Sequence, residues 1–236
     1  MRVPLYSFIS KLFKYGPVKK LKATLRPIKH FLFGKKEIYE VIDIVKRNNQ
    51  GSEDCRVVFD VGAAVGDTAV TFLKSFPKAT VYCFEPLPES FAALKRNIAG
   101  FGERVRCFNF ALSDRNGVAD FYMNANHDSS SFVTKPSGVG GATIKVNVRR
   151  LDDVIRELGI EKIDFMKVDV EGWEKEFIDG GKTAFKEKID NLFIEINPVY
   201  CGGERKHFYI DVLEMIYAAG FSWVGVFGDF FFTKNK

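Results

Sequence analysis

The residues Val57-Val58-Phe59-Asp60-Val61-Gly62-Ala63-Ala64-Val65-Gly66-Asp67-Thr68 carry the strongest structural signal in the chain. Apolar and β-branched side chains dominate residues 57–61, which is typical of a buried strand, and residues 68–76 have the pattern of a helix. The glycines and alanines between them predict a turn that leaves backbone N–H groups free at a helix N-terminus, with little side chain to block a ligand. Such a strand–turn–helix is typical of a site for a nucleotide or nucleoside.

Strands and helices alternate along most of the remaining chain. This α/β rhythm predicts a parallel sheet with right-handed crossovers. Two pairs of strands depart from this alternation. The first pair flanks a polar segment at 124–141, which is long enough for a functional lid, and the second is a terminal antiparallel pair. We expect strands at 56–61, 80–84, 105–112, 118–123, 143–148, 163–170, 192–196, 223–227 and 230–233, and helices at 37–49, 68–76, 88–99, 152–158, 173–179, 183–188 and 208–219.

Charge is distributed unevenly. Residues 1–36 hold ten Lys or Arg and no Asp or Glu, whereas the remainder holds 25 basic and 30 acidic residues. The mildly acidic remainder, residues 37–236, is expected to be the catalytic domain, and its charge argues against a broad nucleic-acid surface. In residues 1–36 the cations alternate with apolar side chains at helical spacing. This pattern fits an arm that docks on a membrane surface or a partner, or short helices that cover one side of the domain.

The cysteines Cys55, Cys83, Cys107 and Cys201 lie far apart, without metal-ligand or redox-pair spacing. We expect buried, inert thiols in a reduced, intracellular setting. No apolar run is long enough to span a membrane, and no secretory signal is recognisable. The sequence therefore predicts a cytoplasmic protein, with membrane association only through residues 1–36, and no metal site.

The glycine spacing of the turn restricts the class of ligand that the turn can bind. Gly62 and Gly66 stand four residues apart, which differs from the G-x-G-x-x-G pattern of dinucleotide sites, and no Gly-Lys-Ser/Thr phosphate loop follows. Glycines in such turns also occur for packing reasons. The turn allows close approach of a bulky ligand without demanding a pyrophosphate.

Two further segments belong to the same predicted crevice. Glu85 ends the second strand, 19 residues beyond Gly66, where a carboxylate can accept hydrogen bonds from both hydroxyls of a ribose. Residues 111–114, Ala-Leu-Ser-Asp, are expected to end the third strand beside the adenine, although Ser113-Asp114 also suits an ordinary turn. Together these residues predict a nucleoside site.

The fourth parallel strand ends in Lys167-Val168-Asp169-Val170-Glu171-Gly172. Strand alternation would put Lys167, Asp169 and Glu171 on one side, at the edge of the sheet where ligands of open α/β folds bind. Clustered ionisable groups are costly unless they function or pair, so a structural Lys–Asp pair is the alternative.

The combined motifs resemble the FkbM family of class I S-adenosylmethionine-dependent methyltransferases, over roughly residues 55 to 200. They are Asp60-Val-Gly-Ala-Ala-Val-Gly-Asp-Thr, Phe84-Glu-Pro-Leu-Pro, Ala111-Leu-Ser-Asp, Leu151-Asp-Asp and Lys167-Val-Asp-Val-Glu-Gly-Trp-Glu. The resemblance implies a Rossmann-like fold with a mostly parallel seven-stranded sheet, helices on both faces and an antiparallel C-terminal strand. It also implies O-methylation of a sugar, polysaccharide or secondary metabolite. Ala64 departs from the family, which usually has Asn there.

Motifs and resemblance together give an expected cofactor site and a set of candidate bases. The S-adenosylmethionine site comprises Asp60, Gly62, Ala63, Gly66, Thr68, Glu85, Ala111, Ser113, Asp114 and Asp169. An alkyl hydroxyl needs a base to become a good nucleophile. Asp169 is the first candidate, either as base or as cofactor contact, Glu171 is the second and His127 the third. Residues 129–131, three serines, could contact a polyhydroxylated acceptor.

Two other functions share part of this pattern. A nucleotide-dependent oxidoreductase would have the same strand–turn–helix and ribose acid, but it requires a different glycine spacing. A non-catalytic domain that docks through residues 1–36 is the other alternative. A metal ion bridging Asp169 and the acceptor is conceivable, although the sequence has no ligand cluster that requires one.

Overall fold

The computed structural model describes residues 34–49, 51, 54–124, 130–131, 141–196, 208–225 and 229–234. The chain separates into two compact units, Met1–Glu40 and Val41–Lys236. Helix α3 (Gly34–Asn48) begins in the first unit and ends in the second. Most of the basic arm predicted at residues 1–36 lies outside the described residues, so its role stays a prediction. The second unit contains both sheets described for this chain.

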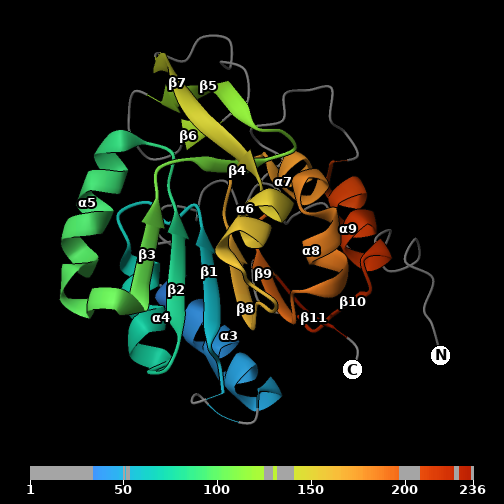
Figure 1. Cartoon of the computed structure of the whole chain (residues 1–236). Coiled ribbons are helices and arrows are strands. Elements are labelled where there is room, and N and C mark those ends of the chain that lie inside the picture. The colour runs from blue at the N-terminus through green and yellow to red at the C-terminus, as the bar shows by residue number, and fades with distance from the viewer. Residues whose placement is uncertain are drawn as a thin grey trace, which may run out of the picture. The chain divides into compact units, whose positions relative to one another are not determined.

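A seven-stranded sheet forms the centre of this unit, in the order β10-β11-β9-β8-β1-β2-β3 (Figure 1). All neighbouring pairs are parallel except those of β11, which is antiparallel to both β9 and β10. This arrangement confirms the predicted mostly parallel sheet with an antiparallel C-terminal strand. The strands are β1 (Val57–Val61), β2 (Thr80–Phe84), β3 (Val105–Phe108), β8 (Phe165–Val168), β9 (Asn191–Ile194), β10 (Phe221–Trp223) and β11 (Phe230–Lys234).

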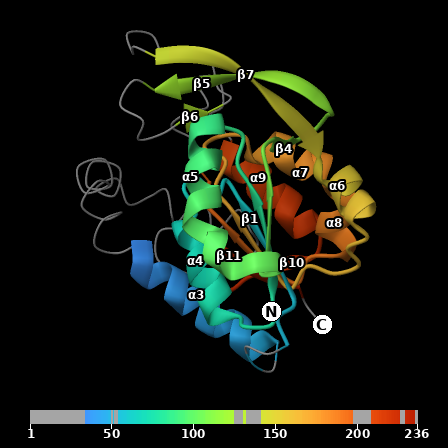
Figure 2. The ribbon, with the colours of Figure 1, turned by 60° about the vertical axis from the view of Figure 1, so that its left-hand side comes forward.

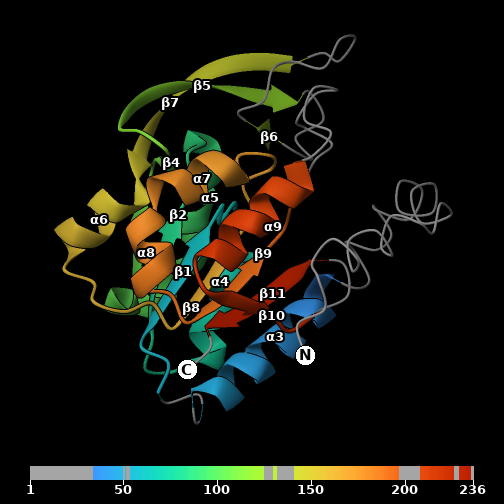
Figure 3. The same cartoon turned by 90° about the vertical axis from the view of Figure 1, so that its right-hand side faces the viewer.

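Helices cover both faces of the sheet, as predicted. Helices α4 (Asp67–Ser75) and α5 (Pro88–Ile98) lie on one face (Figure 2). The other face carries α7 (Glu174–Gly180), α8 (Lys182–Glu187) and α9 (Phe208–Ala218), which stand in front of the sheet in Figure 3. The Phe72 ring of α4 meets the Phe165 ring of the sheet edge to face at 5.2 Å, and Phe177 of α7 meets Phe185 of α8 at 5.5 Å. These contacts pack α4 against the sheet and α7 against α8.

A second sheet lies beyond the carboxyl ends of the parallel strands (Figure 1). It has the order β4-β7-β5-β6, and its two long strands are those predicted at 118–123 and 143–148, which pair antiparallel. Its apolar core includes Ala119, Phe121 and Val148, and Leu87 from the loop after β2 packs against that core. The strands are β4 (Ala111–Ser113), β5 (Gly117–Asn124), β6 (Ser130–Ser131) and β7 (Gly141–Arg150).

The prediction of one strand at 105–112 is wrong. Strand β3 ends at Phe108, and residues 111–113 form β4, which pairs with β7 of the second sheet. The chain bends at Asn109, whose side-chain amide donates to the carbonyls of Glu85 at 2.9 Å and Pro86 at 3.0 Å. These bonds tie the bend to the loop after β2, so the next residues leave the first sheet.

The polar segment predicted as a lid is described only in part. Ser130 and Ser131 form β6, which pairs with Met123 and Tyr122 of β5. His127 and residue 129 lie outside the described residues, so their proposed contacts with an acceptor stay predictions. No helix in the described ranges is long and apolar enough to cross a membrane.

Candidate active site

The turn after β1 is held against the loops that follow β2 and β8. Gly62 and Ala63 donate their N–H groups to the Phe84 carbonyl at 3.0 and 3.1 Å. Gly62 has φ +77°, and a Cβ atom there would lie 1.9 Å from the carbonyl oxygen of Asp169. Only glycine fits this contact. The glycine thus brings the predicted cofactor turn and the predicted base into contact.

Helix α5 fixes the other end of the turn. A Cβ atom on Gly66, where φ is +95°, would lie 2.7 Å from Cδ1 of Leu94. The Asn97 side-chain amide donates to the Val65 carbonyl at 2.8 Å, while the Val65 side chain is 40% exposed. Gly66 is therefore required for packing and also begins α4, whose N-terminus has no side-chain cap. Ala63 is buried at this turn, and Thr68 follows in the first turn of α4.

Glu85 is buried between two backbone segments. One carboxylate oxygen accepts a hydrogen bond from the Ala64 N–H and the other from the Leu87 N–H, both at 2.9 Å. Burial raises the pKa of Glu85 to about 7, although the bonds from Leu87 and Ala64 pull that pKa down. Each oxygen keeps acceptor capacity for a further donor. Glu85 therefore braces the turn and can still accept bonds from ligand hydroxyls.

Three charged side chains meet where β1 and β8 end. Asp60 and Lys167 are register partners on these neighbouring strands. The Lys167 ammonium lies 3.2 Å from Oδ2 of Asp169 and 4.0 Å from Oδ1 of Asp60. The cluster is graded in exposure: the side chain of Asp60 is fully buried, that of Lys167 is 12% exposed and that of Asp169 is 26% exposed. Asp169 is thus the member that a ligand can reach.

The cluster contains more acceptors than the protein satisfies. Neither Asp60 oxygen has a hydrogen-bond partner among the described residues, and the same holds for Oδ1 of Asp169. Burial raises the pKa of Asp60 to about 6, with Lys167 lowering that pKa and Asp169 raising it. Buried carboxylates without partners are costly, so this edge of the sheet suits a positively charged ligand.

The predicted alternation does not extend to Glu171, because β8 ends at Val168. Glu171 and Gly172 have φ values of +48° and +95°, and the Trp173 N–H donates to the Val170 carbonyl at 3.2 Å. These features are those of a tight turn with positive φ at both central residues. Glu171 therefore occupies a turn next to Asp169, and its side-chain direction is not set by the strand.

Residues 111–114 are positioned by the second sheet. Ala111 belongs to the core of that sheet. The buried Ser113 hydroxyl donates to Asp114 at 2.9 Å and accepts from the indole N–H of Trp173 at 3.1 Å. Asp114 also pairs with Arg115 at 3.0 Å. The Ser113 hydroxyl is committed to these contacts, and a cofactor contact by residues 111–114 stays a prediction.

Trp173 is a site element that the sequence reasoning missed. Its indole bond to Ser113 joins the loop after β8 to the second sheet, and a Cβ atom on Gly180 of α7 would lie 1.7 Å from the Ser113 carbonyl oxygen. The only sequence signal was a tryptophan two residues after Glu171. Its partner lies 60 residues earlier in the chain, which no local pattern reveals.

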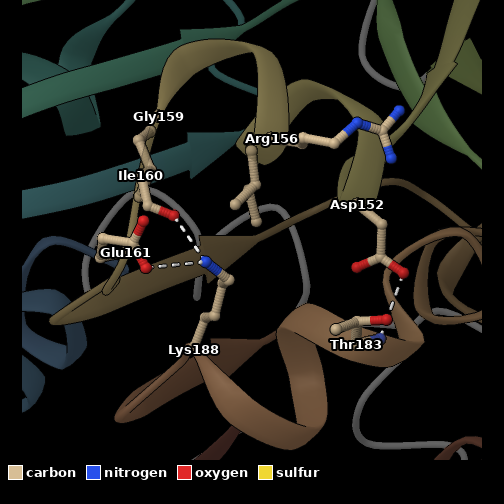
Figure 4. A pocket seen from close by; sticks show the side chains of 8 residues that line it. Asp152, Arg156, Gly159, Ile160, Glu161, Thr183 and Lys188 are labelled. Carbon is tan, nitrogen blue, oxygen red and sulfur yellow. Dashed lines mark hydrogen bonds and ion pairs between the residues drawn. The ribbon is translucent and has the colours of Figure 1, made fainter.

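A cavity of about 300 Å³ lies elsewhere, between α6 (Leu151–Leu158), the segment before β8 and α8 (Figure 4). Its polar groups bond mainly to one another: Asp152 accepts from the Thr183 N–H at 3.1 Å, and Lys188 donates to the Ile160 carbonyl at 2.9 Å. No residue of the glycine turn or the Asp60 cluster lines it. Across the described part of the chain, no group of His, Cys, Asp or Glu is placed to hold a metal ion.

Comparison with known proteins identifies the family of this chain. The sequence matches the family described as "Methyltransferase FkbM domain" over residues 60–222. It is 37% identical over 142 residues to "2-O-methyltransferase NoeI" of Sinorhizobium fredii, covering 54% of this chain and 58% of that protein. It is 31% identical over 171 residues to "31-O-demethyl-FK506 methyltransferase FkbM" of Streptomyces tacrolimicus, covering 61% and 66%.

The chain thus spans less than two thirds of the length of either relative. Among solved structures, monomeric WbdD superimposes with a TM-score of 0.50 at 13% identity, over 84% of this chain and 40% of that chain. This likeness concerns the fold alone. The family match includes the glycine turn, Glu85 and the Asp169 block, and it covers well over half of the sequence. The chain belongs to the FkbM family of class I S-adenosylmethionine-dependent methyltransferases.

Proposed function

We propose that this chain transfers a methyl group from S-adenosylmethionine to a hydroxyl of a small molecule or glycan. The observation that carries the proposal is the cluster at the ends of β1 and β8, where one ammonium faces two carboxylates beside a glycine turn. The net negative charge of this cluster complements a cationic nucleoside. A dinucleotide would bring phosphates to the same edge, which the cluster would repel.

The residues present fit this cofactor. Glu85 would hold the ribose hydroxyls, the turn at 62–66 would receive the body of the nucleoside, and Asp169 would face its cationic end. Asp60 is closed off from solvent, so it would act on the ligand through its charge. When bound, S-adenosylmethionine supplies an activated methyl group, and the chain has to align the acceptor and exclude water.

Asp169 is the proposed base. It is the most exposed member of the cluster, with a side chain that is 26% exposed. An acceptor hydroxyl placed beside it would pass its proton to this carboxylate as the bond to the methyl group forms. Base catalysis of this kind contributes about 10²- to 10⁴-fold. Glu171, in the adjacent turn, is the second candidate.

The acceptor is proposed as a hydroxylated compound. The names "2-O-methyltransferase" and "31-O-demethyl-FK506 methyltransferase" describe transfer to oxygen in two relatives. Transfer of radiolabelled methyl groups from S-adenosylmethionine to panels of glycans, lipid-linked sugars and hydroxylated metabolites would identify it. In that assay Asp169→Asn should keep cofactor binding better than turnover, which should fall at least 100-fold. Full turnover in Asp169→Asn, with loss in Glu171→Gln, would assign the base to Glu171.

Cofactor binding is tested by calorimetric titration with S-adenosylmethionine. Glu85→Ala should weaken binding at least tenfold because it removes charge-assisted hydrogen bonds, and Gly62→Arg should abolish binding because its side chain fills the turn. Glu103→Gln, an exposed position remote from the turn, is the matched control. Unchanged affinity in both site variants would contradict the proposal. Detection of a bound nicotinamide dinucleotide by native mass spectrometry would favour an oxidoreductase.

A further inference from the structure

We propose that Lys167 is a positioning residue for methyl transfer: its ammonium orients the Asp169 carboxylate and ties it to the cofactor turn. This inference rests on the proposed function. Lys167 does not belong to the set of residues assigned to cofactor or base above. Its place in the structure gives it a role distinct from neutralising charge.

The Lys167 ammonium connects three segments. It lies 3.2 Å from Oδ2 of Asp169, 3.5 Å from the Gly62 carbonyl and 4.0 Å from Oδ1 of Asp60. The contacts with Asp169 and the Gly62 carbonyl are hydrogen bonds, whereas the contact with Asp60 is an ion pair without a hydrogen bond. Lys167 thus holds Oδ2, while Oδ1 of Asp169 is buried and has no hydrogen-bond partner among the described residues.

The charges keep this lysine ionised. Burial alone would lower the pKa of Lys167, but Asp169 and Asp60 outweigh burial and raise that pKa above its usual value. Glu195, which follows β9, adds to the same effect. A permanently charged ammonium cannot itself be the base. It can hold the Asp169 carboxylate in place while that carboxylate takes the proton.

The net charge of the cluster allows it to accept that proton. With Lys167 charged and Asp60 and Asp169 ionised, its net charge is −1. When the acceptor hydroxyl gives its proton to Asp169, the oxygen keeps the electron pair that bonds the methyl group, and the cluster becomes neutral. S-adenosylmethionine, held by Glu85 and the turn at 62–66, would supply the methyl group and keep the electron pair of the broken carbon–sulfur bond, so the total charge of the site would be unchanged. Lys167 limits the cluster to one surplus negative charge.

A purely structural role makes a different prediction. If Lys167 only neutralises the buried Asp60, removing both charges together should restore the wild-type properties. If Lys167 positions Asp169, the double variant should recover stability without recovering function. Lys167→Met, Asp60→Asn and the double variant Asp60→Asn/Lys167→Met separate these cases, because methionine keeps the length and apolar stem of lysine.

The first readout needs no acceptor. Carboxyl ¹³C NMR of protein labelled at aspartate reports the Asp169 environment, with its signal assigned by loss in Asp169→Asn. We expect the Asp169 signal to shift in Lys167→Met and to stay shifted in the double variant. The melting temperature should fall in Lys167→Met and recover in the double variant. An Asp169 signal that does not move in Lys167→Met would overturn the proposal.

The second readout is turnover with radiolabelled S-adenosylmethionine and the acceptor found in the screen. We expect kcat to fall at least 100-fold in Lys167→Met and in the double variant. Lys167→Arg should recover part of that kcat. In all three variants the dissociation constant of the cofactor should change less than tenfold. A double variant whose kcat lies within threefold of that of Asp60→Asn would overturn the proposal. Absence of cofactor binding in the wild-type protein would instead contradict the proposed function.

Discussion

Two residues of the site have backbone conformations that their side chains disfavour. Ala64 has φ +46° and Glu171 has φ +48°, and they are the non-glycine residues with positive φ in the described part of the chain. Each costs about 1–2 kcal/mol relative to a normal conformation. Both lie in turns that adjoin the Asp60 cluster. Strain of this size persists where the surrounding contacts determine the turn, as the bond from the Ala64 N–H to Glu85 does here.

Ala64→Asn should relieve part of that strain. Asn tolerates positive φ better than Ala, and the Ala64 side chain is exposed, so no packing is lost. We expect the free energy of unfolding, measured by urea denaturation, to rise by about 0.5–1 kcal/mol. Ala63→Gly, at the buried neighbouring position, is the control and should lower it. A loss of stability in Ala64→Asn would show that the alanine methyl group makes a needed contact. A rise in stability would indicate that the Asn usual in the family at this position serves backbone geometry rather than a polar contact.

Asp60 should make stability depend on pH. Its pKa is about 6 in the folded chain against an ordinary value of 3.8, so the folded state binds the proton more tightly than the unfolded state. The stabilising contribution of the protonated form is therefore complete below about pH 4 and lost as the pH rises through about 6.

Asp60→Asn mimics the protonated form at every pH. At pH 8 its free energy of unfolding should exceed that of the wild type by about 3 kcal/mol, the equivalent of a shift of roughly two pKa units. The difference should shrink as the pH approaches 4. Denaturant unfolding at a series of pH values measures it, with the exposed Asp43→Asn as control. A pH-independent difference would show that the ionisation of Asp60 is not its source.

The contact between the turn after β1 and the loop after β8 determines the geometry of the site. Gly62→Ala would place a Cβ atom 1.9 Å from the Asp169 carbonyl oxygen, at a φ that favours glycine. We expect S-adenosylmethionine binding to fall at least 100-fold and the free energy of unfolding to fall by about 2–4 kcal/mol, because two backbone segments must separate. Gly100→Ala has open space around its Cβ position and is the matched control. Calorimetry and urea denaturation of both variants provide the test, and wild-type binding in Gly62→Ala would refute the close approach.

The two sheets meet around Glu85 and Trp173. Leu87 packs into the core of the second sheet, and the N–H of the same residue bonds Glu85. Trp173 bonds Ser113 of β4. A ligand held by Glu85 would therefore stabilise the first sheet and its junction with the second.

S-adenosylmethionine should accordingly protect the whole catalytic unit from unfolding. At 100 times its dissociation constant, a ligand that binds only the folded state adds about 2.7 kcal/mol to the free energy of unfolding. For a chain of this size that corresponds to a rise in melting temperature of roughly 5–10 °C. Differential scanning fluorimetry measures the shift, and at the same cofactor concentration the shift should be smaller in Glu85→Ala. Equal shifts in both proteins would remove Glu85 from the cofactor site.

Local patterns in the sequence were enough to predict the first sheet. Buried strands at 57–61 and 80–84, the glycine turn and the helices α4 and α5 follow from hydrophobic runs, glycines and proline within short windows. Because parallel strands place their carboxyl ends at one edge, the same patterns predicted that Glu85 and Asp169 would lie near the turn. The structure brings both into contact with it.

The second sheet and the contacts within the charged cluster depend on tertiary structure. The amide of Asn109 bends the chain only because the Glu85 and Pro86 carbonyls, more than 20 residues earlier, are within reach. Glu171 does not continue the predicted strand alternation because β8 ends at Val168 and a tight turn follows. Sequence determines which residues have charge and which segments are apolar, since these are local properties. Which carboxylate Lys167 holds, and which glycine admits a neighbouring backbone, depends on distances between segments that only the packed chain brings together.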